Sequence, residues 1–228
     1  MTDSLPLYRK TKTLFPRPGF FGVLTLQGEK MLAEAVPGIA SDAEEMQAVR
    51  AIGTVRCLAL CAQLGAVFTP FDSSALYRCF LVATTPPPAD SHIASVPIDT
   101  DSGGNFVVAC TPDPPIPVEG CNLWDNGDVS VRIQRRNNMF DHSEASYIHP
   151  TVASKVAGTY SGGQSSSDSV QSDGALEWGL IADTLGWTGQ NTAKRYPLAE
   201  FSLDIPPTGQ YAYCSPSEYQ DAVGRIRR

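Results

Sequence analysis

The densest group of side chains that could do chemistry lies in one short polar stretch. Asp141, His142, Glu144 and His149 supply two carboxylates and two imidazoles, the groups that bind metal ions or move protons in acid–base catalysis. Their spacing matches no helical pair of histidines four residues apart, and no pair of cysteines lies nearby in the sequence. We therefore interpret this stretch as a polar loop and predict no metal site.

Two of the six cysteines, Cys57 and Cys61, are four residues apart in an apolar stretch. In a helix this spacing puts both thiols on one face, where they could form half of a metal site. No CxxC pair completes the set, so we interpret them as two small core residues. The N-terminal residues are polar and do not resemble a secretory signal. We therefore expect reduced thiols and a cytoplasmic location (the host cytoplasm or a virion if the chain is viral); a disulfide framework is the alternative.

A serine motif, Asp101-Ser102-Gly103-Gly104, is similar to the segment around the nucleophilic serine of chymotrypsin-like proteases, Gly-Asp-Ser-Gly-Gly. Thr100 stands where that family has glycine. The only preceding histidine, His92, is ten residues away and cannot take the family's role. A glycine turn between two strands explains the motif, so we predict no catalytic residue and no cofactor. An enzyme with an unfamiliar site is the less favoured alternative.

Charge is distributed unevenly along the chain. The net charge is −7, yet residues 1–17 hold four basic side chains against Asp3, and residues 225–228 hold three arginines. Three further arginines lie close together, one in the predicted strand 128–134 and two directly after it. Basic groups of this kind contact nucleic acid or an acidic neighbouring subunit, or are simply solvated. The candidate contact residues are Arg9, Lys10, Lys12, Arg17, Arg132, Arg135, Arg136, Arg225, Arg227 and Arg228.

Most of the elements that must position these groups are predicted to be short strands. The ranges with the composition typical of strands are 20–27, 76–84, 105–111, 128–134 and 196–205. Eighteen prolines and nineteen glycines favour many loops over a helical bundle. A short helix is expected over 29–36. Another is expected at the C-terminus, where Ser215 and Glu218 form a capping box with Pro216 at the first helical position.

The clearest predicted element is a helix over residues 42–64. Ser41 and Glu44 form a capping box, and from Ala51 onward the residues are apolar on nearly every helical face. We therefore predict an α+β fold in which a mostly antiparallel sheet packs on this central buried helix, with long Pro/Gly/Ser-rich loops. A viral jelly roll is an alternative that a buried helix so early in the chain disfavours.

The chain is expected to form one α+β domain, residues 18–224, between an extended basic arm (1–17) and a basic tail (225–228). Residues 158–174 are rich in Ser and Gly and predict a flexible loop. They could instead divide the chain into two halves, but the residues after them are few for an independent core. No stretch of eighteen apolar residues exists, so no membrane contact is expected.

Proline, alanine and serine are abundant, with 18, 23 and 20 residues. This composition, carried by runs such as 83–89 (ATTPPPA) and 165–167 (SSS), resembles the proline-alanine-serine-rich proteins that coat the double-stranded RNA of polymycoviruses of fungi. The resemblance implies a structural protein, a viral coat or capsid subunit that self-associates into a homo-oligomer or particle and contacts RNA through its basic ends. The alternative is a soluble, protein-binding adaptor module.

Overall fold

The structure is a computed structural model, and it describes residues 12–64, 73–85, 95–98, 111–136, 138–149, 152–153, 196–207 and 212–227. The fold is α+β, as the sequence predicts. In chain order the elements are β1 (Phe21–Leu26), α2 (Gly28–Ala35), α3 (Glu44–Ile52), β2 (Arg56–Leu64), β3 (Ser74–Ala83), β4 (Ser95–Pro97), β5 (Asn122–Gln134), β6 (Leu198–Ser202) and α7 (Pro216–Ile226).

The strands predicted over 20–27, 76–84, 128–134 and 196–205 correspond to β1, β3, the C-terminal half of β5, and β6. The helix predicted over 29–36 is α2. The strand predicted over 105–111 lies almost wholly outside the described residues, and the Ser/Gly-rich loop 158–174 lies wholly outside them.

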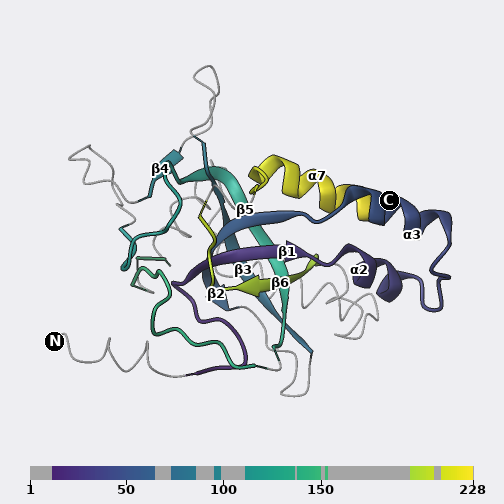
Figure 1. The fold of residues 1–228 in the computed structure, drawn as a ribbon, viewed down its shortest axis with the longest axis horizontal. Helices are drawn as coiled ribbons and strands as arrows, with labels where there is room; N and C mark the ends of the chain where they lie inside the picture. Colours follow the sequence, from purple (N-terminus) through teal and green to yellow (C-terminus); the bar gives the residue numbers. More distant parts are fainter. Residues whose placement is uncertain are drawn as a thin grey trace, which may run out of the picture.

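Five strands close into a barrel. β1 pairs antiparallel with β2, β2 with β3, and β3 with β5. β6 completes the ring, because it pairs antiparallel with β1 on one side and parallel with β5 on the other. The short strand β4 adds to the edge of β5 (Figure 1). The sheet is therefore mostly antiparallel, with the β5–β6 pair as the parallel exception among the described strands.

The predicted central helix over residues 42–64 is wrong. The helix there, α3, ends at Ile52, and Gly53 with a φ of 75° follows it. The apolar run that we expected to continue the helix forms β2, which lies between β1 and β3. Leu58 packs on one side of the sheet and Ala59 on the other, and both are fully buried. A strand buried on both faces is apolar at every position, and this pattern is also that of a buried helix.

The predicted capping box at Ser41 is also wrong. The residue that precedes the first turn of α3 is Ala43, and no side chain caps this end. The backbone carbonyl of Ser41 instead accepts a hydrogen bond from the Arg50 guanidinium at 2.7 Å. The helix therefore begins three residues after the serine and carries two acidic residues, Glu44 and Glu45, in its first turn.

Two hydrophobic clusters lie on the two sides of the strands. The interior cluster takes residues from all five barrel strands and fills the barrel. The outer cluster covers the opposite face of β1, β2 and β3 with residues from loops: Ile98, Ile116, Val118, Ile148, Ala153 and Ile205. The outside of these strands is therefore not a solvent-facing surface but the inner side of a second layer, built from irregular chain.

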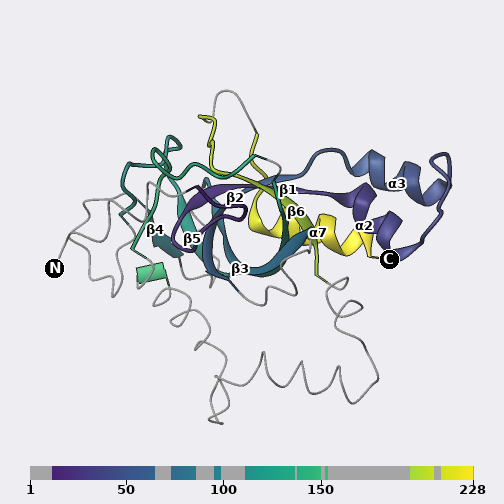
Figure 2. The same ribbon diagram turned by 90° about the horizontal axis from the view of Figure 1, so that it is seen from below.

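The three helices of the described residues, α2, α3 and α7, lie together away from β4 (Figures 1 and 2). Leu32 of α2 and Val49 of α3 pack in a small cluster that the C-terminal Ile226 also contacts. α7 packs on the interior cluster through Tyr219 and Ala222. No helix in the described part of the chain is long and apolar enough to cross a membrane.

α7 begins at the predicted capping box, which is confirmed. The Glu218 backbone N–H donates to Ser215 Oγ at 3.3 Å, and the Ser215 backbone N–H donates to Glu218 Oε2 at 2.7 Å. These hydrogen bonds from Ser215 lower the pKa of the Glu218 carboxyl. Pro216 occupies the first turn, as expected.

A glycine substitution tests the closure of the barrel. A Cβ on Gly22 of β1 would lie 2.4 Å from the Ser202 carbonyl oxygen and 2.5 Å from Cζ of Phe201, both in β6. We expect Gly22→Ala to destabilise the protein by about 1–3 kcal/mol, because backbone or a buried ring must move. Urea unfolding followed by circular dichroism measures this change.

The matched control is the same substitution in α7. A Cβ on Gly224 would meet no described atom within 4 Å, so Gly224→Ala should raise the free energy of unfolding by about 0.4–1 kcal/mol. Equal effects of the two substitutions would contradict the close β1–β6 contact.

Candidate functional site

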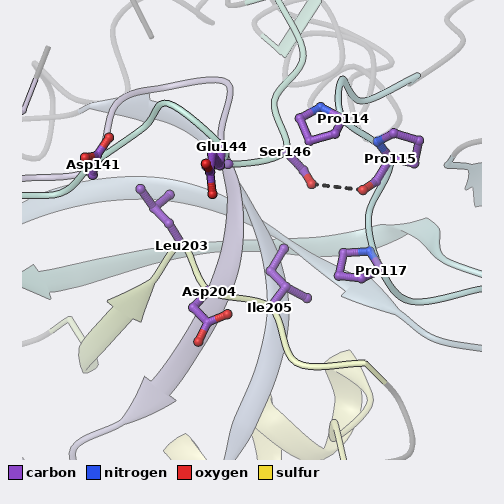
Figure 3. A pocket seen from close by; sticks show the side chains of 10 residues that line it. Pro114, Pro115, Pro117, Asp141, Glu144, Ser146, Leu203, Asp204 and Ile205 are labelled. Atoms are coloured by element: carbon purple, nitrogen blue, oxygen red, sulfur yellow. Dashed lines mark hydrogen bonds between the residues drawn. The ribbon is translucent and has the colours of Figure 1, made fainter. Parts of the chain in front are cut away.

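A pocket of about 420 Å³ lies where three loop segments meet. Its walls come from residues 114–117 before β5, residues 141–146 after β5, and residues 203–205 directly after β6. Figure 3 shows the prolines on one side, Asp141 on the other, and Leu203 with Ile205 between them. The pocket therefore combines an apolar wall with three carboxylates, Asp141, Glu144 and Asp204.

The acidic loop 141–146 is held in place by a buried histidine. His142 is fully buried, 4.5 Å from the ring centre of Phe20, and its Nε2 accepts a hydrogen bond from the Arg17 backbone N–H at 3.3 Å. A backbone hydrogen bond from Phe21 to the Ser146 carbonyl, 2.9 Å, fixes the other end of the loop. With the imidazole turned into the core, the side chains of Asp141 and Glu144 are left exposed at the pocket.

This placement decides how the polar stretch 141–149 is used. His142 is a packing residue, whereas His149 is exposed. Within the described parts of the chain, no three His, Cys, Asp or Glu side chains are grouped so that they could hold a metal ion. The structure therefore brings Asp141 and Glu144 together at the pocket but directs His142 away from them.

Hydrogen bonds and one ion pair fix the charge of Asp141. Its Oδ1 accepts from the Ser143 hydroxyl at 2.7 Å and from the Ser143 backbone N–H at 3.1 Å, and its Oδ2 lies 3.3 Å from Lys12 Nζ. These donors lower the pKa of the Asp141 carboxyl, and the two hydrogen bonds from Ser143 have the largest effect. Asp141 therefore stays ionised at a lower pH than an ordinary aspartate. Glu144 and Asp204 have no cationic partner among the described residues.

The other side of the pocket is stiff and apolar. Ser146 Oγ donates to the Pro115 carbonyl at 3.2 Å and so ties the proline segment to the acidic loop (Figure 3). Prolines lose little conformational entropy when they are covered, and the aliphatic stems of Lys and Arg pack well on such surfaces. A pocket of this kind is suited to a basic peptide segment, whose charged ends would reach the carboxylates.

Two of the predicted contact residues contact the acidic loop, and a third lies beside the residue that precedes it. Lys12 pairs with Asp141, the backbone of Arg17 contacts His142, and the Arg136 guanidinium lies 5.4 Å from the ring centre of Phe140. The chain enters this region through paired backbone hydrogen bonds between Thr13 and Phe140. The end of the predicted arm is therefore docked on the loop that forms the pocket.

Arg132 was predicted to be a surface contact, and this is wrong. The side chain is buried, with 6% exposed, and its guanidinium pairs with Glu34 of α2. Its Nε also donates to the Tyr196 carbonyl at 3.2 Å. A lone arginine on a strand looks solvated in the sequence, because the helix that supplies its partner is almost a hundred residues away.

The remaining basic candidates are spread over the molecule. Arg135 is exposed just beyond β5, and Arg225 is exposed in the last turn of α7. Arg227 follows α7, where partial burial and then the charge of Arg132 lower its pKa. Arg9, Lys10 and Arg228 lie outside the described residues, as does the serine motif 101–104.

Two features of this region are not predictable from the sequence. Asp204 was not considered, because its position beside the acidic loop depends on how the chain continues after β6. The run 112–117 was recognisable as a stiff proline loop, but nothing in its sequence indicates which side chains it faces. Both depend on contacts between distant segments.

No family model matches the chain, and no curated protein or solved structure matches it either.

The buried ion pair of Arg132 yields a test of the fold around β5. Glu34→Gln would leave the Arg132 guanidinium buried without its anion, which lowers the free energy of unfolding. We expect a loss of only about 1–2 kcal/mol, because one third of the Glu34 side chain is exposed and solvent screens the ion pair. The control is Glu29→Gln, which removes the exposed partner of Arg50 and should change stability by less than about 0.5 kcal/mol. Equal losses in urea unfolding would contradict the burial of Arg132.

Proposed function

We propose that the chain is a non-enzymatic structural subunit that self-associates, with the basic arm of one copy docked in the acidic pocket of a neighbouring copy. The observation that carries the proposal is the pocket itself, in which Glu144 and Asp204 lie beside a wall of prolines. Their negative charge complements Arg9 and Lys10 near the start of the same sequence. A copy of the chain thus holds both halves of a contact.

The position of the arm allows a contact at the pocket. Lys12 is the first described residue, and it already pairs with Asp141 at the rim of the pocket. Lys10 and Arg9 lie two and three residues before it, and an extended chain spans about 3.3–3.6 Å per residue, so they can reach a pocket within roughly 10 Å of this rim when a neighbouring copy packs against it. Since the Asp141 charge is taken by Lys12 of the same copy, Glu144 and Asp204 are left for the arm of another.

The geometry of the exchange sets the assembly. Two copies that exchange arms reciprocally form a symmetric dimer, whereas a one-way, head-to-tail exchange closes into rings or continues into larger assemblies. We propose a coat-type particle as the class of assembly, on the basis of the proline-, alanine- and serine-rich composition and the uneven charge. In this arrangement exposed arginines such as Arg135 and Arg225 are left for RNA.

Light scattering after size-exclusion chromatography tests the contact. We expect the wild-type chain to elute above its monomer mass of 24.5 kDa and to dissociate as salt rises, because exposed charges are screened. Deleting residues 1–11, or introducing Glu144→Lys with Asp204→Lys, should yield monomers. Glu45→Lys, an exposed charge reversal on α3, is the control and should leave the assembly unchanged.

A charge exchange makes the test specific. Reversing the arm with Arg9→Glu and Lys10→Glu should disrupt assembly in the wild-type background and restore it in the Glu144→Lys, Asp204→Lys background. A wild-type chain that remains monomeric at all concentrations and at low salt would refute the proposal and favour the adaptor module. Absorbance at 260 nm across the peak shows whether RNA accompanies the assembly.

A further inference from the structure

Four cysteines of the interior cluster are arranged as two neighbouring pairs. Cys61 of β2 and Cys79 of β3 are direct cross-strand partners, and both are fully buried. Cys57, near the start of β2, and Cys214, directly before the capping residue of α7, lie close enough for their thiols to interact, while the Cys57 thiol itself donates to the Leu58 carbonyl at 3.4 Å. All the described cysteines are free thiols.

The backbone holds the second pair together. The Cys214 N–H donates to the Arg56 carbonyl at 2.8 Å, so Cys214 lies alongside the first residues of β2. Both side chains contact the same interior cluster. A disulfide bond requires a sulfur–sulfur distance of about 2.05 Å with Cβ atoms about 3.5–4.5 Å apart. Two thiols on adjacent backbone segments that pack on one cluster are placed for such a bond.

The two thiols of this pair differ in access and in acidity. Cys214 is half-buried, whereas Cys57 has no exposed surface. The neighbouring Cys57 thiol lowers the pKa of the Cys214 thiol, against the opposing effects of burial and of the Glu218 carboxylate, and the same interaction together with burial raises the pKa of Cys57. Cys214 also precedes the N-terminus of an 11-residue helix, whose dipole favours a thiolate. Cys214, the accessible thiol of the pair, is therefore the nucleophile. Cys57 is the resolving thiol, which attacks the oxidised Cys214 in the second step.

The Cys61–Cys79 pair lacks these properties. Neither thiol has exposed surface, and burial raises the pKa of Cys61 well above its ordinary value. A small reagent in solution cannot reach either sulfur in the folded protein. The chain therefore contains its own control, a second close pair of cysteines in the same barrel that should stay reduced.

We propose that Cys57 and Cys214 are a thiol–disulfide exchange site for low-molecular-weight disulfides of the glutathione class. The Cys214 thiolate attacks one sulfur of the reagent, whose S–S bond breaks, and the expelled thiolate takes up a proton. Cys57 then gives up its proton and attacks Cys214 Sγ, which expels the second thiol of the reagent. Two protein thiols are oxidised to one disulfide, and one reagent disulfide is reduced to two thiols.

The bond would join α7 to β2. α7 contacts the interior cluster through Tyr219. The Tyr219 hydroxyl is buried and has no hydrogen-bond partner among the described residues. Burial opposes ionisation of the phenol and raises its pKa. In the reduced protein the capping segment is held to β2 by the Cys214–Arg56 backbone bond and side-chain packing. The disulfide would keep the helix on the barrel when these contacts open, and would raise the midpoint of thermal unfolding.

Mass spectrometry of the full-length native protein tests the site with glutathione disulfide as the reagent. We expect the wild type to lose two hydrogens in mass and to yield one cross-linked peptide that joins Cys57 to Cys214, both reversed by dithiothreitol. Cys57→Ser should instead stop at a mixed disulfide, with one glutathione on Cys214. Cys214→Ser should not react at this site.

Cys79→Ala is the matched control, because it breaks the other pair and should leave the Cys57–Cys214 cross-link unchanged. A wild-type protein that keeps glutathione on Cys214, remains reduced, or cross-links Cys61 to Cys79 instead would overturn the proposal. The assay reads a covalent bond inside one copy, so its result is independent of whether the arm docks in the acidic pocket.

Discussion

The burial of β2 on both faces is the constraint on which the other contacts of this molecule depend. Its alternate residues fill the barrel on one side and pack beneath loops on the other, so neither side can be left to water. Barrel closure through β6 satisfies the first requirement, since it removes the free edges of the sheet. The second requires a covering layer, and here irregular chain before and after β5 and after β6 supplies it.

Both candidate sites lie where segments contributing to this packing meet. Ile116 and Ile205 are covering residues of the outer cluster, and the pocket opens between their segments and the loop that His142 anchors. At the start of β2 the cover is the segment leading into α7, and its contact with the strand brings Cys214 to Cys57. Covering the barrel with loops rather than with a regular layer leaves hollows and close approaches between distant parts of the chain.

The sequence predicted the elements whose signals are local. The strands β1, β3 and β6 follow from their composition, and α7 follows from the Ser215–Glu218 capping box. β2 was misassigned because double burial erases the alternation that distinguishes a half-buried strand from a helix. Arg132, the Cys57–Cys214 pair and the position of Asp204 were out of reach, because each depends on a partner between about 60 and 160 residues away.

In the proposed assembly, the acidic pocket would hold the arm through many weak contacts rather than through one strong contact. An exposed ion pair such as Lys12–Asp141 contributes little, and a contact to Glu144 or Asp204, which have no cationic partner among the described residues, would be similarly weak. A single arm in a single pocket would therefore dissociate readily. In a closed ring or particle, however, the arms and pockets of each copy act together, and the effective concentration of every further contact is raised. Weak, salt-sensitive contacts of this kind would be stable only in the complete assembly, and an incomplete assembly would dissociate into its subunits.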